Sequence, residues 1–245
     1  MRFGPDDGLY LTDTQFEAMC GRISLFADID TIVDRFGVDI PEQFTPRYNV
    51  APSDSLTVIT NERATELSHL HWGLVPHWAD DPAAGPEPIN ARRESLNEAA
   101  PFREPYETRR CLVVVDGYYE WRDTPRGAQP VRFERVDREP FALAGLWDRW
   151  EGNGQQLETV AIVTTEAISA VADVHHRMPL ILPSAMEGSW LTEPPDDPMD
   201  ETLEPGWDGS FHHYRVSKRV NDPENDDPSV TEPVDDGDQP TLADF

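Results

Sequence analysis

The chain has 245 residues, enough for one large domain or two small ones, and its 38% hydrophobic content is low but compatible with a buried core. It holds no run of about 18 apolar residues, and its first 18 residues carry four acids and no apolar block, which excludes a membrane span and a secretory signal. Two cysteines cannot form a disulfide framework. We therefore expect a cytoplasmic protein, and the 23 prolines favour a loop-rich fold.

The charge is strongly negative and unusual in its composition. Asp and Glu number 47 against 20 Lys and Arg, a net charge of −27, and Lys218 is the single lysine. Such a surface suits a protein in molar salt, because ions screen its self-repulsion. The composition resembles that of haloarchaeal proteins, with an ordinary acidic protein as the alternative. The charge argues against a generic nucleic-acid binder but leaves room for a local arginine patch.

Helix and strand patterns follow one another along a single body, residues 19–220, which lies between an 18-residue extension (1–18) and a tail (221–245). Ile29, Ile32, Val33 and Phe36 have helical spacing after Asp28, and Gly37 ends the run. A second helix is expected at 184–191 with Ser184 as its cap. Strands are predicted at 56–60, 65–72, 111–115, 118–122, 131–135, 141–147 and 156–165. The pattern indicates an α+β fold, a single domain around a curved, mainly antiparallel, barrel-like sheet with few helices.

The tail differs from the body in composition. Residues 221–245 contain nine acids and no Lys or Arg, so we expect them to be disordered.

Four polar side chains of different chemistry lie beside Gly, Pro or Arg where predicted strands end: Cys20, Asn90, Glu120 and His175. A thiol, an amide, a carboxylate and an imidazole together suffice for covalent catalysis. Each alone also has an ordinary structural explanation, as an inert core thiol, a turn cap or a solvated acid. None of them decides the function singly.

Six motifs occur in a fixed order over about 160 residues. They are Met-Cys-Gly-Arg at 19–22, Arg-Tyr-Asn-Val-Ala-Pro at 47–52, Trp-Gly-Leu-x-Pro-x-Trp at 72–78, Asn-Ala-Arg-x-Glu at 90–94, Gly-Tyr-Tyr-Glu-Trp at 117–121 and His-x-Arg-Met-Pro at 175–179. Together they resemble the SRAP family, the SOS-response-associated peptidases, which are understood as abasic-site-processing proteins.

The resemblance implies a covalent DNA-lesion protein without a cofactor or metal. Family members bond to abasic sites in single-stranded DNA through an N-terminal cysteine, which shields the lesion. The matching positions here are Cys20 as nucleophile, surrounded by Asn90, Glu120 and His175. Arg92 and Arg177 match residues that hold the DNA backbone. The motifs also contain Trp78, Arg47 and Asn49, which complete the expected DNA-binding set of a protein that we expect to be monomeric.

The chemistry itself favours an N-terminal cysteine. An abasic sugar opens to an aldehyde, which only a neutral amine attacks, and an α-amino group with a pKa of about 7.7–8.0 is partly neutral where a lysine is not. The neighbouring thiol then closes a five-membered thiazolidine ring, and proximity favours this step. His175 and Glu120 would move protons, and Asn90 would orient the amine or sugar by hydrogen bonding.

Cys20 is not the first residue, and its nitrogen is bonded to Met19. Translation starting at Met19 followed by removal of Met, self-cleavage of the Met19–Cys20 bond, and a retained extension with loss of activity are the three explanations. We favour the first.

Three other functions fit parts of the sequence. A Cys–His–Asn hydrolase would use Cys20, His175 and Asn90 on an amide, but would not need Arg92, Arg93, Arg109, Arg110 and Arg177, which suit a phosphate backbone. A non-catalytic single-strand binder would stack bases on Trp72 and Trp78 and leave the cysteine unexplained. A zinc site lacks the usual Cys and His spacings.

Overall fold

Strand β6 (Arg110–Val115) is the buried strand that the sequence predicts. In the computed structural model, which describes residues 20–39, 44–193 and 211–234, all six of its residues are buried. Cys111, Val113 and Val115 belong to one hydrophobic cluster, and Leu112 and Val114 belong to the other. Alternate side chains therefore enter two cores, as the two-residue period of a strand requires.

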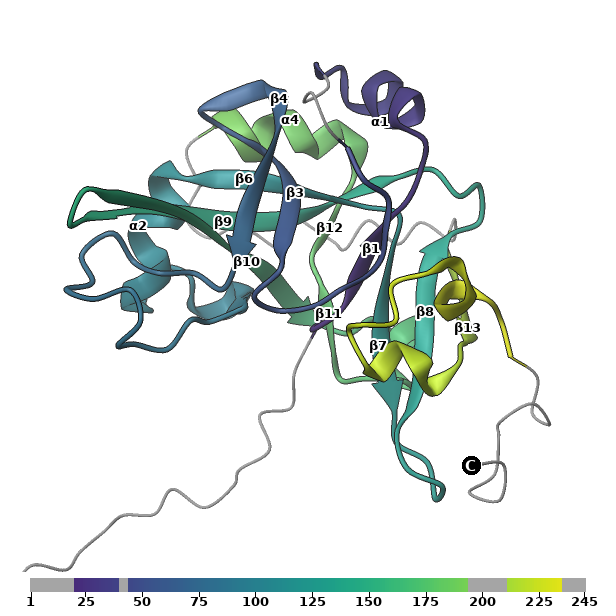
Figure 1. The fold of residues 1–245 in the computed structure, drawn as a ribbon. Coiled ribbons are helices and arrows are strands. Elements are labelled where there is room, and N and C mark those ends of the chain that lie inside the picture. Colours follow the sequence, from purple (N-terminus) through teal and green to yellow (C-terminus); the bar gives the residue numbers. More distant parts are fainter. Residues whose placement is uncertain (1–19, 40–43, 194–210, 235–245) are drawn as a thin grey trace, which may run out of the picture.

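The larger sheet closes on itself (Figure 1). Its main strands lie in the order β4 (Arg63–Trp72), β3 (Ser55–Thr60), β6, β9 (Phe141–Gly152) and β10 (Gln155–Glu166), each antiparallel to the next. Strand β10 returns to β4 through a short parallel contact between Thr159 and His71. Three short strands extend it: β5 (Asn90–Arg92) and β11 (Arg177–Pro179) on β10, and β12 (Ile181–Leu182) on β9. The barrel-like, mainly antiparallel core is confirmed.

A second, antiparallel sheet carries the amino-terminal strand. Its order is β13 (Phe211–Arg215), β8 (Gln129–Arg135), β7 (Gly117–Arg122), β1 (Ile23–Leu25) and β2 (Arg47–Val50). One residue, Asp116, joins β6 to β7 and so links the two sheets. Its carboxylate accepts hydrogen bonds from the Ser24 hydroxyl (2.6 Å) and the Ala27 backbone N–H (2.9 Å). The end of β1 is thereby fixed against the junction.

Helices cover the outside of the barrel. The packed helices are α1 (Ile29–Phe36), α2 (Ala100–Thr108) and α4 (Ser184–Thr192), while α3 (Ser169–Ala172) and the 3₁₀ turns η1 (Arg93–Ser95), η2 (Lys218–Asn221) and η3 (Pro228–Thr231) are short. Helix α1 ends at Gly37 in the left-handed conformation, as predicted. In helix α4 the N-cap position is occupied by Pro183, without a side-chain capping bond, and Ser184 is the first helical residue. No helix among the described residues is both long and apolar enough to cross a membrane.

The prediction of a disordered tail is wrong for residues 221–234. Val230 is buried beside Val220 and Tyr119. Asp226 accepts hydrogen bonds from the backbone N–H groups of Tyr48 (2.6 Å) and Asn49 (2.9 Å). Asp226, one of the acids that suggested disorder, instead satisfies two backbone donors of β2, which stabilises an ordered segment. The extension 1–18, Met19 and residues 235–245 lie outside the described part of the chain.

Candidate active site

The two sheets bring the backbone of Cys20 to the carboxylate of Glu120. Strands β1 and β7 are antiparallel with Ile23 opposite Tyr118, so the residues just before β1 lie beside Glu120. The backbone nitrogen of Cys20 donates a hydrogen bond to Glu120 Oε1 at 2.8 Å. Both residues are buried, with 0% and 1% of their surfaces exposed. A nitrogen of the expected nucleophile therefore contacts a carboxyl group that is shielded from water.

Burial favours the neutral forms of the acids in this site. It raises the pKa of Glu120 to about 8, against the smaller opposing effect of the hydrogen bond from Cys20. Burial, and then the charge of Glu120, raise the pKa of the Cys20 thiol well above its usual range. The same two causes, with Cys20 as a third, raise the pKa of Tyr118. Glu120 can therefore exchange a proton near neutral pH, whereas the thiol stays protonated.

Tyr118 was not singled out by the sequence. It lies two residues before Glu120 on β7, so both side chains are on the same face of the strand. Its ring stacks on Phe133 with centroids 4.8 Å apart, and its buried hydroxyl has no hydrogen-bond partner among the described residues. The motif at 117–121 could have indicated Tyr118, because residues two apart in a strand point to the same face of the sheet.

The backbone at Cys20 is strained. Its φ angle is +41°, in the left-handed region that residues with a side chain rarely adopt. Such a conformation costs on the order of 1–3 kcal/mol. This angle is the rotation about the N–Cα bond of Cys20, which is adjacent to the peptide bond whose cleavage would free the Cys20 amine.

Asn90, on β5, and His175, in the connection between α3 and β11, approach the same core. Ile89 and Val174, the residues directly before them, pack in the hydrophobic cluster that contains Cys20. Asn90 begins β5, opposite Ile162 of β10. The Nδ1 atom of His175 lies 3.1 Å from both the backbone nitrogen and the backbone oxygen of Arg177, which fixes the orientation of the ring.

The side chain of Arg177, which we expected to contact DNA, is engaged within the protein. Its side chain is only 9% exposed and forms a two-pronged ion pair with Glu94, at 2.8 and 3.0 Å. It also donates to the backbone oxygen of Thr164 at 2.8 Å. Arg177 therefore ties β11 to β10 and to η1, and a phosphate would have to displace Glu94. Arg92, by contrast, is exposed on β5.

Asn49 and Arg47, like Arg177, make their contacts within the fold. Asn49 is fully buried and accepts from Arg22 Nη1 at 2.8 Å, while its amide donates to three backbone oxygens of residues 220–225. Arg47 forms ion pairs with Asp226 and Asp54. Both hold the 221–234 segment on β2, and Asn49 exposes no surface through which it could contact DNA.

The two tryptophans of the third motif have opposite environments. Trp72 is fully buried, and its indole donates to the Ile89 backbone oxygen at 2.9 Å, so it cannot stack on a base. Trp78 is 58% exposed. The arginine cluster is likewise divided, since Arg110 is buried on backbone oxygens and Arg109 pairs with Asp148. The arginines were expected to favour a DNA-binding protein over an amide hydrolase. Because Arg109 and Arg110 are engaged within the fold, this argument is weaker than the motifs suggested.

The chain matches the family model described as SOS response associated peptidase (SRAP) over residues 19–223. It belongs to the SRAP family. Among curated relatives, "Abasic site processing protein YoqW" of Bacillus subtilis is 39% identical over 222 residues, covering 87% of this chain and 99% of that protein. "Abasic site processing protein YedK" of Escherichia coli is 30% identical over 185 residues, 71% and 80% of the two chains.

Solved structures show the same fold. A crystal structure of a protein from Bacteroides thetaiotaomicron has a TM-score of 0.78 and 26% identity, and covers 88% of this chain and 100% of that one. The fold of the body of this protein is therefore shared with a solved structure, and the SRAP family model covers residues 19–223.

Proposed function

We propose that this SRAP protein processes abasic sites in single-stranded DNA by forming a covalent thiazolidine with Cys20 as its N-terminal residue. The observation that carries the proposal is the buried contact between the Cys20 nitrogen and Glu120, at 2.8 Å. The names of the relatives, which are abasic site processing proteins, support the same substrate. A DNA substrate is in keeping with a cytoplasmic protein.

The reaction follows from the groups present. Once the amine is free, the Glu120 carboxylate accepts a proton from the ammonium, and the neutral amine attacks the aldehyde carbon of the opened sugar. The resulting carbinolamine takes up a proton from Glu120 on its hydroxyl group and loses water, and the iminium ion that remains returns a proton to Glu120 to give a neutral imine. The Cys20 sulfur then adds to the imine carbon as its proton passes to nitrogen, and the five-membered ring closes. Glu120, with its pKa of about 8, suits both proton transfers near neutral pH.

Asn90 and His175 have auxiliary roles in this reaction. We assign to Asn90 the orientation of the amine or sugar by hydrogen bonding, and to His175 a proton shuttle during imine formation and ring opening. The ring of His175 is held by the backbone of Arg177, which suits a group that must meet a substrate in one orientation.

DNA contacts are restricted to the exposed members of the expected set. Trp78 stacks on a base and Arg92 binds a backbone phosphate. Arg177 and Arg47 act on the fold through Glu94 and Asp226. A monomer with this small contact set binds intact DNA weakly and retains abasic DNA by the covalent bond.

The mature N-terminus is Cys20 in this proposal, through translation from Met19 and removal of Met. The strained φ angle of Cys20 also suits self-cleavage of the Met19–Cys20 bond, which fits the peptidase name of the family. Either route frees the amine that a thiazolidine requires.

The hydrolase alternative is disfavoured by the thiol. A cysteine hydrolase needs a thiolate, and known catalytic cysteines have a lowered pKa. Here burial and Glu120 raise the pKa of Cys20. The amine is therefore the better first nucleophile, and the thiol acts second, on an imine that is already formed.

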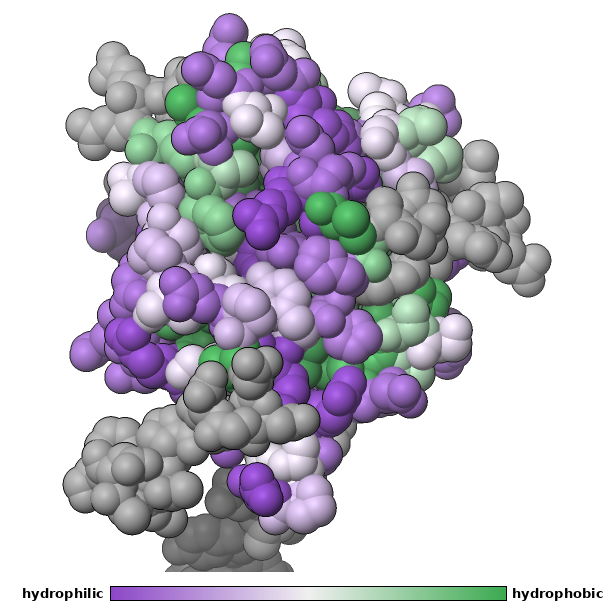
Figure 2. Space-filling view, turned by 90° about the vertical axis from the view of Figure 1, so that its right-hand side faces the viewer, coloured by the Kyte–Doolittle hydropathy of each residue, from purple (hydrophilic) through white to green (hydrophobic). Residues whose placement is uncertain are grey.

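A saline cytoplasm suits this mechanism. The net charge of −27 repels DNA, but molar salt screens that repulsion within a few ångströms. One face of the molecule is predominantly hydrophilic, with small hydrophobic patches between (Figure 2). We propose a halophilic protein, which tolerates this charge density.

The test uses protein expressed from Met19 and a single-stranded oligonucleotide with one abasic site. We expect a protein–DNA adduct that survives heating in denaturant, and none with intact DNA or with Cys20→Ala. An adduct of equal yield from Cys20→Ala would refute the proposal.

A further inference from the structure

Trp78 is an exposed aromatic residue on a backbone that is fixed on both sides. It lies in the connection between β4 and β5, and more than half of its surface is open to solvent. Its neighbours His77 and Ala79 are each anchored to strand β9.

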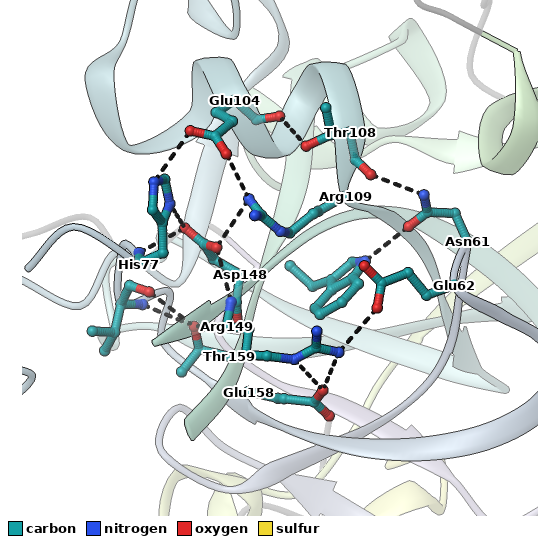
Figure 3. A network of polar contacts seen from close by, with 12 residues as sticks. Asn61, Glu62, His77, Glu104, Thr108, Arg109, Asp148, Arg149, Glu158 and Thr159 are labelled. Carbon is teal, nitrogen blue, oxygen red and sulfur yellow. Dashed lines mark hydrogen bonds and ion pairs between the residues drawn. The ribbon is translucent and has the colours of Figure 1, made fainter. Parts of the chain in front are cut away.

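Asp148 of β9 anchors the residue before Trp78. Its Oδ2 accepts a hydrogen bond from the His77 backbone N–H at 2.8 Å and lies 3.0 Å from His77 Nδ1 (Figure 3). The carboxylate is completely buried, and Arg109 Nη1 lies 3.3 Å from its other oxygen. Because burying a charge is costly, a carboxylate placed here must be compensated by these contacts.

Glu104 of α2 completes the anchor on the outer side. Its carboxylate lies 3.2 Å from His77 Nε2 and 3.1 Å from Arg109 Nη1, so each ring nitrogen of His77 faces an acid (Figure 3). The imidazole is thereby held between a helix and the barrel.

A second, independent anchor holds the residue after Trp78. The indole N–H of Trp150, two residues beyond Asp148 on β9, donates to the Ala79 backbone oxygen at 2.7 Å. The Ala79 N–H donates to the Pro76 backbone oxygen at 3.0 Å, which closes a turn around Trp78. The connection is also closed at its base, where Leu74 N–H donates to the Pro88 oxygen two residues before Asn90.

We infer that Asp148 is a positioning residue for substrate binding: it holds Trp78 in place as a rigid stacking surface for a base next to the abasic nucleotide. The inference rests on the proposed function and adds to it the group that orders the DNA-binding loop. A flexible loop would lose conformational entropy on binding, and an aromatic residue that is already fixed avoids this loss. Trp150 has the same role from the other side.

The experiment compares two single-stranded oligonucleotides that share one abasic site and an identical phosphate backbone. In the first, normal bases flank the abasic site. In the second, the flanking nucleotides are stable tetrahydrofuran residues that lack bases and cannot form an imine. Rates of adduct formation are measured below saturation, in protein expressed from Met19.

We expect Trp78→Ala to slow adduct formation on the first oligonucleotide on the order of ten- to a hundredfold, the usual range for loss of a base stack. Asp148→Asn, which keeps the size of the side chain, should slow it about two- to tenfold. Neither should alter the rate on the second oligonucleotide. Asp148→Asn should add nothing when Trp78 is already replaced by Ala.

Two further variants provide a second test of loop anchoring and a control. Trp150→Phe removes only the hydrogen bond to Ala79. It should slow adduct formation on the first oligonucleotide and not on the second, and it tests the inference even if Asp148→Asn does not fold. Val136→Ala alters the other large exposed hydrophobic residue of the described chain and should change neither rate.

Equal slowing on both oligonucleotides by Asp148→Asn and Trp150→Phe, or additive slowing with Trp78→Ala, would overturn the inference while leaving the covalent mechanism intact. Absence of an adduct from the parent protein on either oligonucleotide would overturn the proposed function and this inference with it.

Discussion

Replacing Glu120 by Gln should change how the stability of the protein depends on pH. Burial raises the pKa of Glu120 from 4.5 to about 8, so between these values the folded protein holds a proton that the unfolded chain releases. Stability that depends on this proton is fully present below pH 4.5 and is lost as the pH rises to about 8. At about 1.36 kcal/mol per pH unit, the loss is about 5 kcal/mol. The amide that Glu120→Gln introduces cannot ionise, so the variant loses none of this stability.

The assay is urea unfolding of the full-length chain at constant salt from pH 5 to pH 9. The advantage of Glu120→Gln over the parent in free energy of unfolding should be small at pH 5 and grow to several kcal/mol by pH 9. Glu98→Gln, which alters an exposed acid, is the control and should follow the parent. A constant difference between Glu120→Gln and the parent across this range would show that Glu120 is ionised in the folded protein, and would remove the basis for its role as a proton carrier.

The other expectations concern the thiols, Tyr118 and salt. Cys20→Ser keeps the amine, so it should give an imine that borohydride traps but no heat-stable adduct; equal heat stability would contradict ring closure. Cys111→Ala should leave the adduct rate unchanged and cost about 1 kcal/mol of stability, because this buried thiol only packs; a loss of adduct in folded protein would show that a second cysteine takes part. Tyr118→Phe removes a buried hydroxyl that has no partner among the described residues and should raise the free energy of unfolding by about 1 kcal/mol; a fall of that size would reveal an unseen hydrogen bond. From 0.1 to 2 M KCl, reversible binding to intact DNA should weaken about eightfold per phosphate contact while the adduct still forms, and Arg92→Ala should slow the adduct more than it lowers its final yield; tight binding at 2 M KCl without an adduct would favour the single-strand binder.

The long strands could be predicted because their signal is local. The apolar run at β6 and the hairpin of β3 and β4 follow from side-chain periods within a few residues. Strands β1, β5 and β11 have three residues each, and only pairing with distant strands defines them. Helix α2 was missed because it contains Pro105 in its interior, where proline usually interrupts a helix.

The members of the site could be named from motifs, but their contacts could not. The nitrogen of Cys20 meets Glu120 across 100 residues of chain, and the pKa of Glu120 depends on burial that both sheets create. The same limit hid the ion pair of Arg177, because its partner Glu94 lies 83 residues away in the chain. The ordered segment after residue 220 was missed because the contacts of Asp226 lie on β2.

The most direct test of the proposed covalent mechanism is the intact mass of the protein after incubation with an abasic single-stranded oligonucleotide, followed by mapping of the modified peptide. The proposal predicts one adduct whose mass is that of the protein from Cys20 plus the oligonucleotide less one water, located on the peptide that begins at Cys20. An adduct on Lys218 or Cys111, or formation of the adduct by protein that retains the Met19–Cys20 bond, would contradict it.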